Sequence, residues 1–115
     1  MTDKVCLFCK IIKKEVPSKA DYEDDEIYAF EDVNPQAPVH ILIVPKKHFE
    51  KLADISESDA ELMGKLLLIA RKIAAKKKLE KGYRIVANNG PQAGQTVFHL
   101  HLHLLGGRRF TWPPG

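Results

Sequence analysis

The chain has 115 residues, which leaves room for one domain, residues 1–115, with little depth for an enclosed pocket. A hydrophobic fraction of 44% and a charged fraction of 29% exclude the disordered and fibrous classes. The net charge of +3 does not indicate a nucleic-acid partner, and no apolar run is long enough for a signal peptide or a membrane span. We therefore expect a cytoplasmic protein whose binding site is a surface cleft or is completed by a second subunit.

Two cysteines near the start of the chain, Cys6 and Cys9, form a C-x-x-C pair. Apolar residues recur at helical spacing around this pair and stop before Pro17, which predicts a short helix over residues 6–14. Without an export signal a structural disulfide is not expected, and a metal clip or a redox pair remains. The pair opens a helix instead of following a strand, and this favours the metal.

Strand patterns lie on both sides of one long helix pattern. The helix is predicted over residues 56–80, with a capping box at Ser58 and Glu61 and a stop at Gly82. The predicted strands span residues 20–23, 26–32, 40–44, 83–87 and 97–105. Because strands and helices do not alternate, the predicted class is α+β, with a mainly antiparallel five-stranded sheet, one long helix and one short helix.

The end of the long helix carries a cluster of basic residues. Its members are Arg71, Lys72, Lys76, Lys77, Lys78 and Lys81. Cations at a helix C-terminus complement the helix dipole and face water. We interpret the cluster as a solvated face, with an anionic partner as the alternative.

The most informative stretch is the alternation of histidine and leucine in the last predicted strand. His99, His101 and His103 are expected to line one face at spacings of about 6.7 Å, since side chains two residues apart on a strand share a face. The leucines between them would pack under the long helix. Three of the five histidines on one face are hard to explain as core filling. They predict either metal ligation or nucleophilic and acid–base chemistry.

A loop rich in amides and glycine precedes this strand. Asn88, Gly94, Gln95 and Thr96 offer amide and hydroxyl donors instead of the carboxylates that a hydrolytic metal centre recruits. Donors in a loop that folds back over the histidines would form the wall of an anion site.

These residues together resemble the histidine triad (HIT) family, whose signature is H-φ-H-φ-H-φ-φ with φ apolar. The resemblance covers nearly the whole chain and includes residues 30–32, 34–40, 45–48, 94–96, 106–108 and 112–115. The closing Trp-Pro-Pro-Gly is similar to the Hint branch, the purine nucleoside phosphoramidases. The resemblance implies a HIT-like fold and a homodimer that joins two sheets through the long helix and an edge strand. Residues 110–115 would then reach toward the partner's site.

The resemblance also implies covalent catalysis by the central histidine. His101 would attack the α-phosphorus of a nucleoside phosphoramidate or acyl-nucleotide, and water would then cleave the nucleotidyl-imidazole. His103 and His40 would flank the phosphate as hydrogen-bond donors. Asn88 and Thr96 would hold the phosphate and the leaving group, with a threonine here in place of the commoner serine. No catalytic metal is required.

The nucleotide is expected beside the predicted hairpin. Asp32 would accept hydrogen bonds from both ribose hydroxyls, and Glu31 stands where animal relatives have a histidine. The resemblance implies an apolar slot for the base, with ordinary core packing as the alternative, formed by Leu7, Phe8, Ile11, Phe30, Val33 and Leu42. The remaining implied nucleotide contacts are Gly94, Gln95 and Trp112.

A zinc-bearing subset of the family contains the C-x-x-C pair. Its four ligands match Cys6, Cys9, His48 and His99, a closed N and S set typical of structural zinc. A pair of buried thiols without metal is the alternative. His99 is thus both a triad member with a catalytic role and a zinc ligand. Because a zinc ligand cannot also shuttle protons, zinc would make this residue a brace that orients the triad.

Three other functions stay open. A non-catalytic nucleotide-binding or interaction module would keep the same pocket. A dinucleoside polyphosphate hydrolase would belong to a neighbouring branch of the family. A metallohydrolase would use His101 and His103 as ligands of a catalytic ion.

Overall fold

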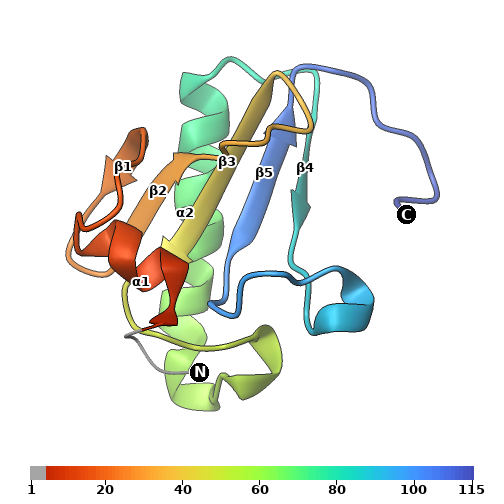
Figure 1. Cartoon of the computed structure of the whole chain (residues 1–115). Helices are drawn as coiled ribbons and strands as arrows, with labels where there is room; N and C mark the ends of the chain where they lie inside the picture. Colours follow the sequence, from red (N-terminus) through yellow and green to blue (C-terminus); the bar gives the residue numbers. More distant parts are fainter. Residues whose placement is uncertain (1–4) are drawn as a thin grey trace.

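A five-stranded antiparallel sheet forms the centre of the computed structural model, which describes residues 5–115 (Figure 1). The strands are β1 (Ala20–Glu23), β2 (Ile27–Glu31), β3 (Val39–Pro45), β4 (Tyr83–Val86) and β5 (Leu102–Gly106), in the spatial order β1-β2-β3-β5-β4. The helices are α1 (Leu7–Ile12) and α2 (Ala60–Lys76). The predicted α+β class with one short and one long helix is confirmed. The first four residues of the predicted domain lie outside the described residues.

Apolar side chains pack on both faces of the sheet. The core on the α2 face includes Ile27, Ala29, Ile41, Ile43, Leu102, Leu104, Leu66, Ile69 and Ile73. The cluster on the α1 face includes Phe8, Cys9, Ile11, Tyr28, Phe30, Leu42 and Val44. Because side chains alternate between faces, β3 is buried on both sides, which explains its unbroken apolar run. The leucines between the triad histidines pack under α2, as expected.

The long helix starts later than predicted. Its N-terminal capping box joins Ser56 and Asp59 instead of Ser58 and Glu61, with the N–H of Ser56 donating to the carboxylate of Asp59 at 2.9 Å. A single 3₁₀ turn then precedes Ala60. Both residue pairs fit the spacing of a capping box, so the sequence alone could not choose between them.

The long helix also ends earlier than predicted, at Lys76 instead of residue 80. Lys78 has a φ of +60°, and the N–H of Leu79 then donates to the carbonyl of Ala74 at 3.0 Å. This is a left-handed helix cap, and it returns Leu79 to the core, where the side chain is buried. The apolar stripe therefore continues past the end of the helix. No helix within residues 5–115 is long and apolar enough to span a membrane.

The last strand begins at Leu102, not at residue 97 as predicted. Before it, the N–H of Leu100 donates to the carbonyl of Phe49 at 2.7 Å, outside the sheet. Of the three histidines only His103 lies on the strand, between β3 and β4. The predicted start of the strand is therefore wrong, because the first two histidines precede it. The expected alternation persists, since the leucines lie in the α2 core while the rings of His99 and His101 both contact Phe8 on the α1 face.

Gly107 and Gly64 give opposite predictions for substitution by alanine. Gly107 has a φ of +89°, and an added Cβ would lie 2.9 Å from the Cβ of Pro38. We expect Gly107→Ala to lower the free energy of unfolding by about 1–3 kcal/mol. Gly64 lies in α2 with no atom within 4 Å of the added Cβ, and Gly64→Ala should raise that free energy by about 0.5–1 kcal/mol. Urea unfolding measures both changes, and equal stabilities of the two variants would contradict the packing around Gly107.

Candidate functional site

Four metal-ligand side chains converge beside the start of α1. Cys6 is the N-cap of this helix, and its Sγ accepts a hydrogen bond from the N–H of Cys9 at 3.4 Å. One helical turn therefore places both thiols at the same end of the helix. His48 follows β3, and His99 precedes β5. The helix is two residues shorter than predicted at its C-terminal end and stops at Ile12.

The ligand atoms of this cluster have the spacing of a tetrahedral site. All four lie within 4.8 Å of one another. The Nδ1 of His48 lies 3.3 Å from the Sγ of Cys9 and 3.1 Å from the Nδ1 of His99. The Nδ1 of His99 lies 3.4 Å from the Sγ of Cys6 and 3.5 Å from the Sγ of Cys9. Ligands that share one zinc ion at bond lengths of about 2.0–2.3 Å have separations of this size.

The protonation of His99 suits a metal ligand. Its Nε2–H donates to the carbonyl of Pro45 at 2.7 Å, so Nδ1 directs a lone pair toward the thiols and His48. Backbone carbonyls commonly orient metal-binding histidines in this way. Two thiols, neither in a disulfide, and two imidazoles fit a closed zinc site, in which bound zinc would cross-link α1 to the flanks of β3 and β5. The structure brings the four predicted ligands together in a cluster that could bind a structural zinc ion.

The backbone of the first triad histidine orients the second. The Nδ1–H of His101 donates to the carbonyl of His99 at 2.7 Å, which leaves Nε2 unprotonated in the neutral ring. The ring is buried and packs edge-on against Phe8, at a centroid distance of 5.0 Å. Burial lowers the pKa of His101. At neutral pH its Nε2 is therefore a nucleophile or a proton acceptor.

A chain of hydrogen bonds fixes the proton of the third triad histidine. The backbone N–H of Gln36 donates to Nδ1 of His40 at 3.0 Å, so the neutral ring of His40 is protonated at Nε2. That Nε2–H donates to Nδ1 of His103 at 2.9 Å, with Oδ2 of Asp32 at 3.4 Å. His103 therefore has its own proton on Nε2, where it is a hydrogen-bond donor.

The environment keeps the imidazoles of His40 and His103 neutral. Burial lowers the pKa of His40, although the nearby Asp32 carboxylate opposes the shift. Burial and the neighbouring imidazoles lower the pKa of His103 to about 4. With Nε2 protonated and Nδ1 accepting from His40, His103 has no lone pair left for a metal. This arrangement disfavours the metallohydrolase interpretation.

The predicted base slot contains both buried and exposed side chains. Four of its six residues lie in the cluster on the α1 face, namely Phe8, Ile11, Phe30 and Leu42. Leu7 is 45% exposed and Val33 is 97% exposed, so neither belongs to that cluster. Trp112, in the C-terminal tail, is 83% exposed. The buried residues form an apolar floor near His101, and contacts of all seven with a nucleotide stay a prediction.

The glycine-rich loop is held together by its own amides. Gln95 is buried, and its side chain bonds three backbone groups, among them the N–H of Gly90 at 2.8 Å. The Nδ2 of Asn88 donates to a carbonyl of the same loop at 2.7 Å, and Gly94 takes a φ of +90° at the turn. Gln95 thus supports the loop from inside. Thr96 is exposed, and its role toward the phosphate stays a prediction.

Glu31 faces away from the α1 side of the sheet. It follows Phe30, which packs in the cluster on that side, so strand alternation directs Glu31 to the α2 face. There it lies 3.9 Å from the ammonium of Lys19. The glutamate at this position, where animal relatives have a histidine, therefore does not alter the apolar floor.

Sequence reasoning missed the backbone groups that select the histidine tautomers. These are the carbonyls of Pro45 and His99 and the N–H of Gln36. Main-chain groups have no residue signature, so only the proline-rich context of Gln36 could have hinted at a rigid loop. Arg108 was also missed as a support, although its Nε–H donates to the carbonyl of Gln36 at 3.0 Å.

The sheet, the neutral imidazoles and the thiol–imidazole cluster define an α+β protein with a candidate metal site beside a group of three buried or half-buried histidines. A family model described as the HIT domain matches residues 13–110, and the chain belongs to the HIT family. It is 50% identical over 117 residues to a 14 kDa zinc-binding protein of Zea mays, covering 100% of this chain and 91% of that protein.

Solved structures of the family have the same fold as this chain over nearly its whole length. A HIT family hydrolase from Legionella pneumophila Philadelphia 1 superposes with a TM-score of 0.94 at 51% identity, covering 96% of this chain and 99% of that chain. A histidine triad nucleotide-binding protein from Candida albicans gives a TM-score of 0.81 at 36% identity, covering 94% of this chain and 82% of that chain.

We expect that removal of one thiol of the cluster removes the zinc ion and lowers the stability of the protein. Purified wild-type protein should contain one zinc ion per chain by inductively coupled plasma mass spectrometry. Cys9→Ala should lose that zinc and at least about 3 kcal/mol of unfolding free energy, because metal binding is coupled to folding. Lys10→Ala, one position along α1, is the control and should keep both. A Cys9→Ala protein with full zinc and wild-type stability would contradict the site.

Proposed function

We propose that the chain is a nucleotide-binding hydrolase. Its substrates would be purine nucleoside 5′-phosphoramidates or acyl-adenylates, cleaved at the P–N or acyl-phosphate bond to release a nucleoside monophosphate such as AMP. The observation that carries the proposal is the 2.7 Å bond from Nδ1 of His101 to the carbonyl of His99, which leaves Nε2 free to attack phosphorus. Membership of the HIT family supports it, as do the names of the Legionella hydrolase and the Candida nucleotide-binding protein.

In the first step a neutral imidazole needs no separate base. The Nε2 lone pair of His101 forms a bond to the α-phosphorus while the P–N or P–O bond to the leaving group breaks. The Nδ1–H stays on the carbonyl of His99, which stabilises the positive charge that develops on the ring. A leaving amine takes a proton from water or through the hydroxyl of Thr96. A leaving carboxylate needs none.

In the second step water cleaves the nucleotidyl-histidine. The water oxygen bonds to phosphorus, the P–N bond to His101 breaks, its electron pair returns to Nε2, and the water proton passes to solvent. His103 would donate its Nε2–H to the phosphoryl oxygens in both steps, since the bond from His40 fixes that proton at the outer nitrogen. A pKa of about 4 keeps His103 a neutral donor with a fixed geometry.

Asp32 is suited to hold the ribose. Its side chain is 19% exposed, and Oδ1 accepts the N–H of Asn34 at 2.8 Å, so the carboxylate is fixed. Lone pairs remain for both ribose hydroxyls, which would select against a deoxyribose. The aromatic floor of Phe8 and Phe30, with ring centroids 5.4 Å apart, would support the base.

Turnover of adenosine 5′-phosphoramidate tests this function. Wild-type protein should release AMP, and His101→Ala should lower kcat/KM by at least about 1,000-fold, because it removes the nucleophile. Lys72→Ala, an exposed helix residue, is the control and should be unchanged. Mass spectrometry of quenched reactions should find a nucleotidyl adduct on His101.

Related assays of the wild type distinguish the remaining functions. AMP binding without turnover would indicate a non-catalytic nucleotide-binding module. Activity lost to a chelator and restored by Zn²⁺ or Mn²⁺ would favour a metallohydrolase, provided circular dichroism shows that the chelated protein stays folded. Faster cleavage of a dinucleoside polyphosphate than of the phosphoramidate would favour the neighbouring branch of the family.

We further propose that the working form is a homodimer. Leu67 and Leu68 of α2 are each 52% exposed, and the sheet leaves two edge strands, β1 and β4, that can pair with another chain. Trp112, exposed in the tail, would contact the partner's site. A dimer would bury these groups without a second core.

Sedimentation equilibrium tests the dimer. The wild type should have about twice the chain mass of 13.0 kDa, and the double variant Leu67→Lys/Leu68→Lys should shift toward the monomer, because it places charges in the expected contact. A monomer of 13.0 kDa with full activity would contradict the proposal.

A further inference from the structure

The segment that follows β3, residues 48–53, is fixed at two neighbouring side chains. The imidazole of His48 belongs to the thiol–imidazole cluster, and the ring of Phe49 packs in the core on the α2 face. The carbonyl of Phe49 also accepts the N–H of Leu100 at 2.7 Å. The candidate metal site and the core therefore determine together where this segment lies, and zinc bound by His48 would fix it further.

Gln95 joins this segment to the glycine-rich loop, residues 88–96, which leads from β4 toward β5 (Figure 1). Its Nε2 donates to the carbonyl of Glu50 at 2.6 Å and to that of Val97 at 3.2 Å, and its Oε1 accepts the N–H of Gly90 at 2.8 Å. The residue is 3% exposed. Both N–H donors of the amide are used inside the protein, so neither is left for a substrate phosphate.

A second amide connects the loop to the same segment. The Oδ1 of Asn89 accepts the N–H of Ala53 at 2.8 Å. Asn89 is exposed, whereas Gln95 is buried, so the loop is attached at two points on different sides. Two points of attachment restrict both the position and the orientation of the loop.

The groups expected to hold the substrate phosphate lie on this loop. Gly94 and Thr96 are the direct neighbours of Gln95 in the chain, so the bonds that fix Gln95 also fix their backbone. Asn88 donates from Nδ2 to the carbonyl of Ala93 at 2.7 Å, within the same loop. Groups that are already in place lose less freedom when they bind a ligand, and this raises the affinity.

We propose that Gln95 is a positioning residue that holds the phosphate-binding groups of the glycine-rich loop in place against the 48–53 segment, which carries the metal ligand His48. The inference rests on the proposed function, which assigns the substrate phosphate to this loop. Gln95 then acts on the phosphate without touching it. The expected site of the base, the aromatic floor of Phe8 and Phe30, is on the α1 face and does not use this connection.

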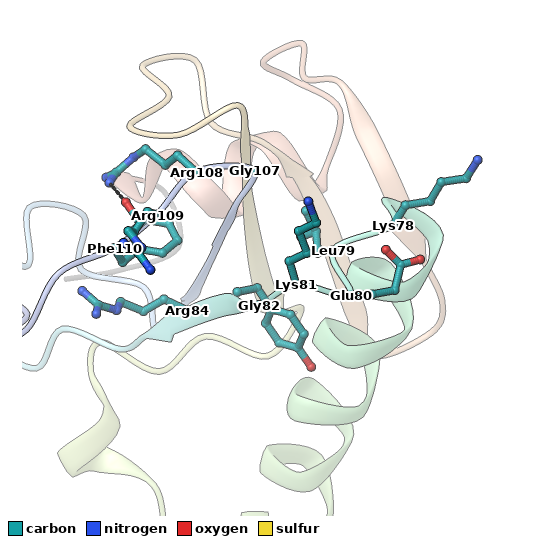
Figure 2. A pocket seen from close by; sticks show the side chains of 11 residues that line it. Lys78, Leu79, Glu80, Lys81, Gly82, Arg84, Gly107, Arg108, Arg109 and Phe110 are labelled. Atoms are coloured by element: carbon teal, nitrogen blue, oxygen red, sulfur yellow. Dashed lines mark hydrogen bonds between the residues drawn. The ribbon is translucent and has the colours of Figure 1, made fainter.

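The connection is compatible with the proposed homodimer. A groove of about 750 Å³ follows the edge strand β4, between the turn after α2 and the segment after β5 (Figure 2). Neither the 48–53 segment nor the glycine-rich loop lines this groove. Because Gln95 is buried, pairing of two chains at β4 requires no change in its bonds.

Calorimetric titration with AMP and with adenosine tests the role of Gln95, because the two ligands differ only in the phosphate. Gln95→Met keeps the size of the side chain and removes its three bonds. We expect the Kd for AMP to weaken at least about tenfold, since buried backbone groups lose their partners, and the Kd for adenosine to stay within about twofold. The matched control is Gln92→Met, an exposed glutamine of the same loop, which should change neither Kd by more than about twofold.

Asn89→Ala tests the second attachment and, at an exposed position, provides a folded variant if Gln95→Met does not fold. It should weaken AMP about threefold and leave adenosine unchanged. Because both amides hold the same loop, the double variant should weaken AMP by less than the product of the two single effects. Effects that multiply in full would show that the two amides act independently, which would contradict a single connection.

The zinc content of each variant, measured by mass spectrometry, should equal that of the wild type. Loss of zinc from Gln95→Met, or equal weakening of AMP and adenosine, would overturn the proposal, because the residue would then support the whole fold. Unchanged AMP binding by Gln95→Met would overturn it as well.

Failure of the proposed reaction has a different result. Wild-type protein that binds AMP more tightly than adenosine but does not cleave the phosphoramidate would contradict the hydrolase, and weaker AMP binding by the variants would still support the role of Gln95. Wild-type protein with equal affinities for AMP and adenosine would contradict the positioning role itself.

Discussion

The hydrogen bond from Nδ1 of His101 to the carbonyl of His99 joins the two centres of this molecule. The imidazole of His99 belongs to the metal cluster, and its Nε2–H is fixed on the carbonyl of Pro45 at 2.7 Å. The carbonyl of the same residue selects the tautomer of His101. Zinc bound at this cluster would hold His99 in place, and the carbonyl of His99 orients His101, the nucleophile in the proposed reaction.

The loop before β3 orients the other two histidines of the site, His40 and His103. The loop before β3 provides the N–H of Gln36 that sets the proton of His40, and through it that of His103. This loop is held in turn by the segment after β5, where Arg108 bonds the carbonyl of Gln36 and Gly107 packs against the loop. Burial lowers the pKa values of His40, His101 and His103 and keeps the three imidazoles neutral. The carbonyl of His99 and the N–H of Gln36, the latter through His40, determine which ring nitrogen carries the proton.

The sequence was sufficient for the class of fold and for the pair Cys6 and Cys9 as metal ligands, because alternation, helical spacing and the C-x-x-C pair are local patterns. The other two ligands, His48 and His99, lie far away in the sequence and followed only from the resemblance to the family. The sequence was insufficient for the geometry of the triad. The leucine and histidine alternation over residues 97–105 predicts a continuous strand, yet the bond from Leu100 to Phe49 and the recruitment of His99 to the metal cluster take its first half out of the sheet. These are long-range contacts that no local pattern encodes. The ends of α2 were misplaced for a related reason, since Leu79 continues the apolar stripe after the helix has stopped.

The tautomer of His101 is the most direct measure of whether the candidate metal site and the proposed nucleophile are coupled through the carbonyl of His99. Long-range ¹H–¹⁵N correlation spectra of zinc-loaded protein with ¹⁵N-labelled histidine distinguish protonated from unprotonated ring nitrogens, and His101→Asn identifies the signals. At neutral pH, His101 should show a protonated Nδ1 and an unprotonated Nε2, as its bond to the carbonyl of His99 requires. A His101 ring protonated at Nε2, or one that exchanges between both tautomers in the zinc-loaded protein, would contradict this coupling.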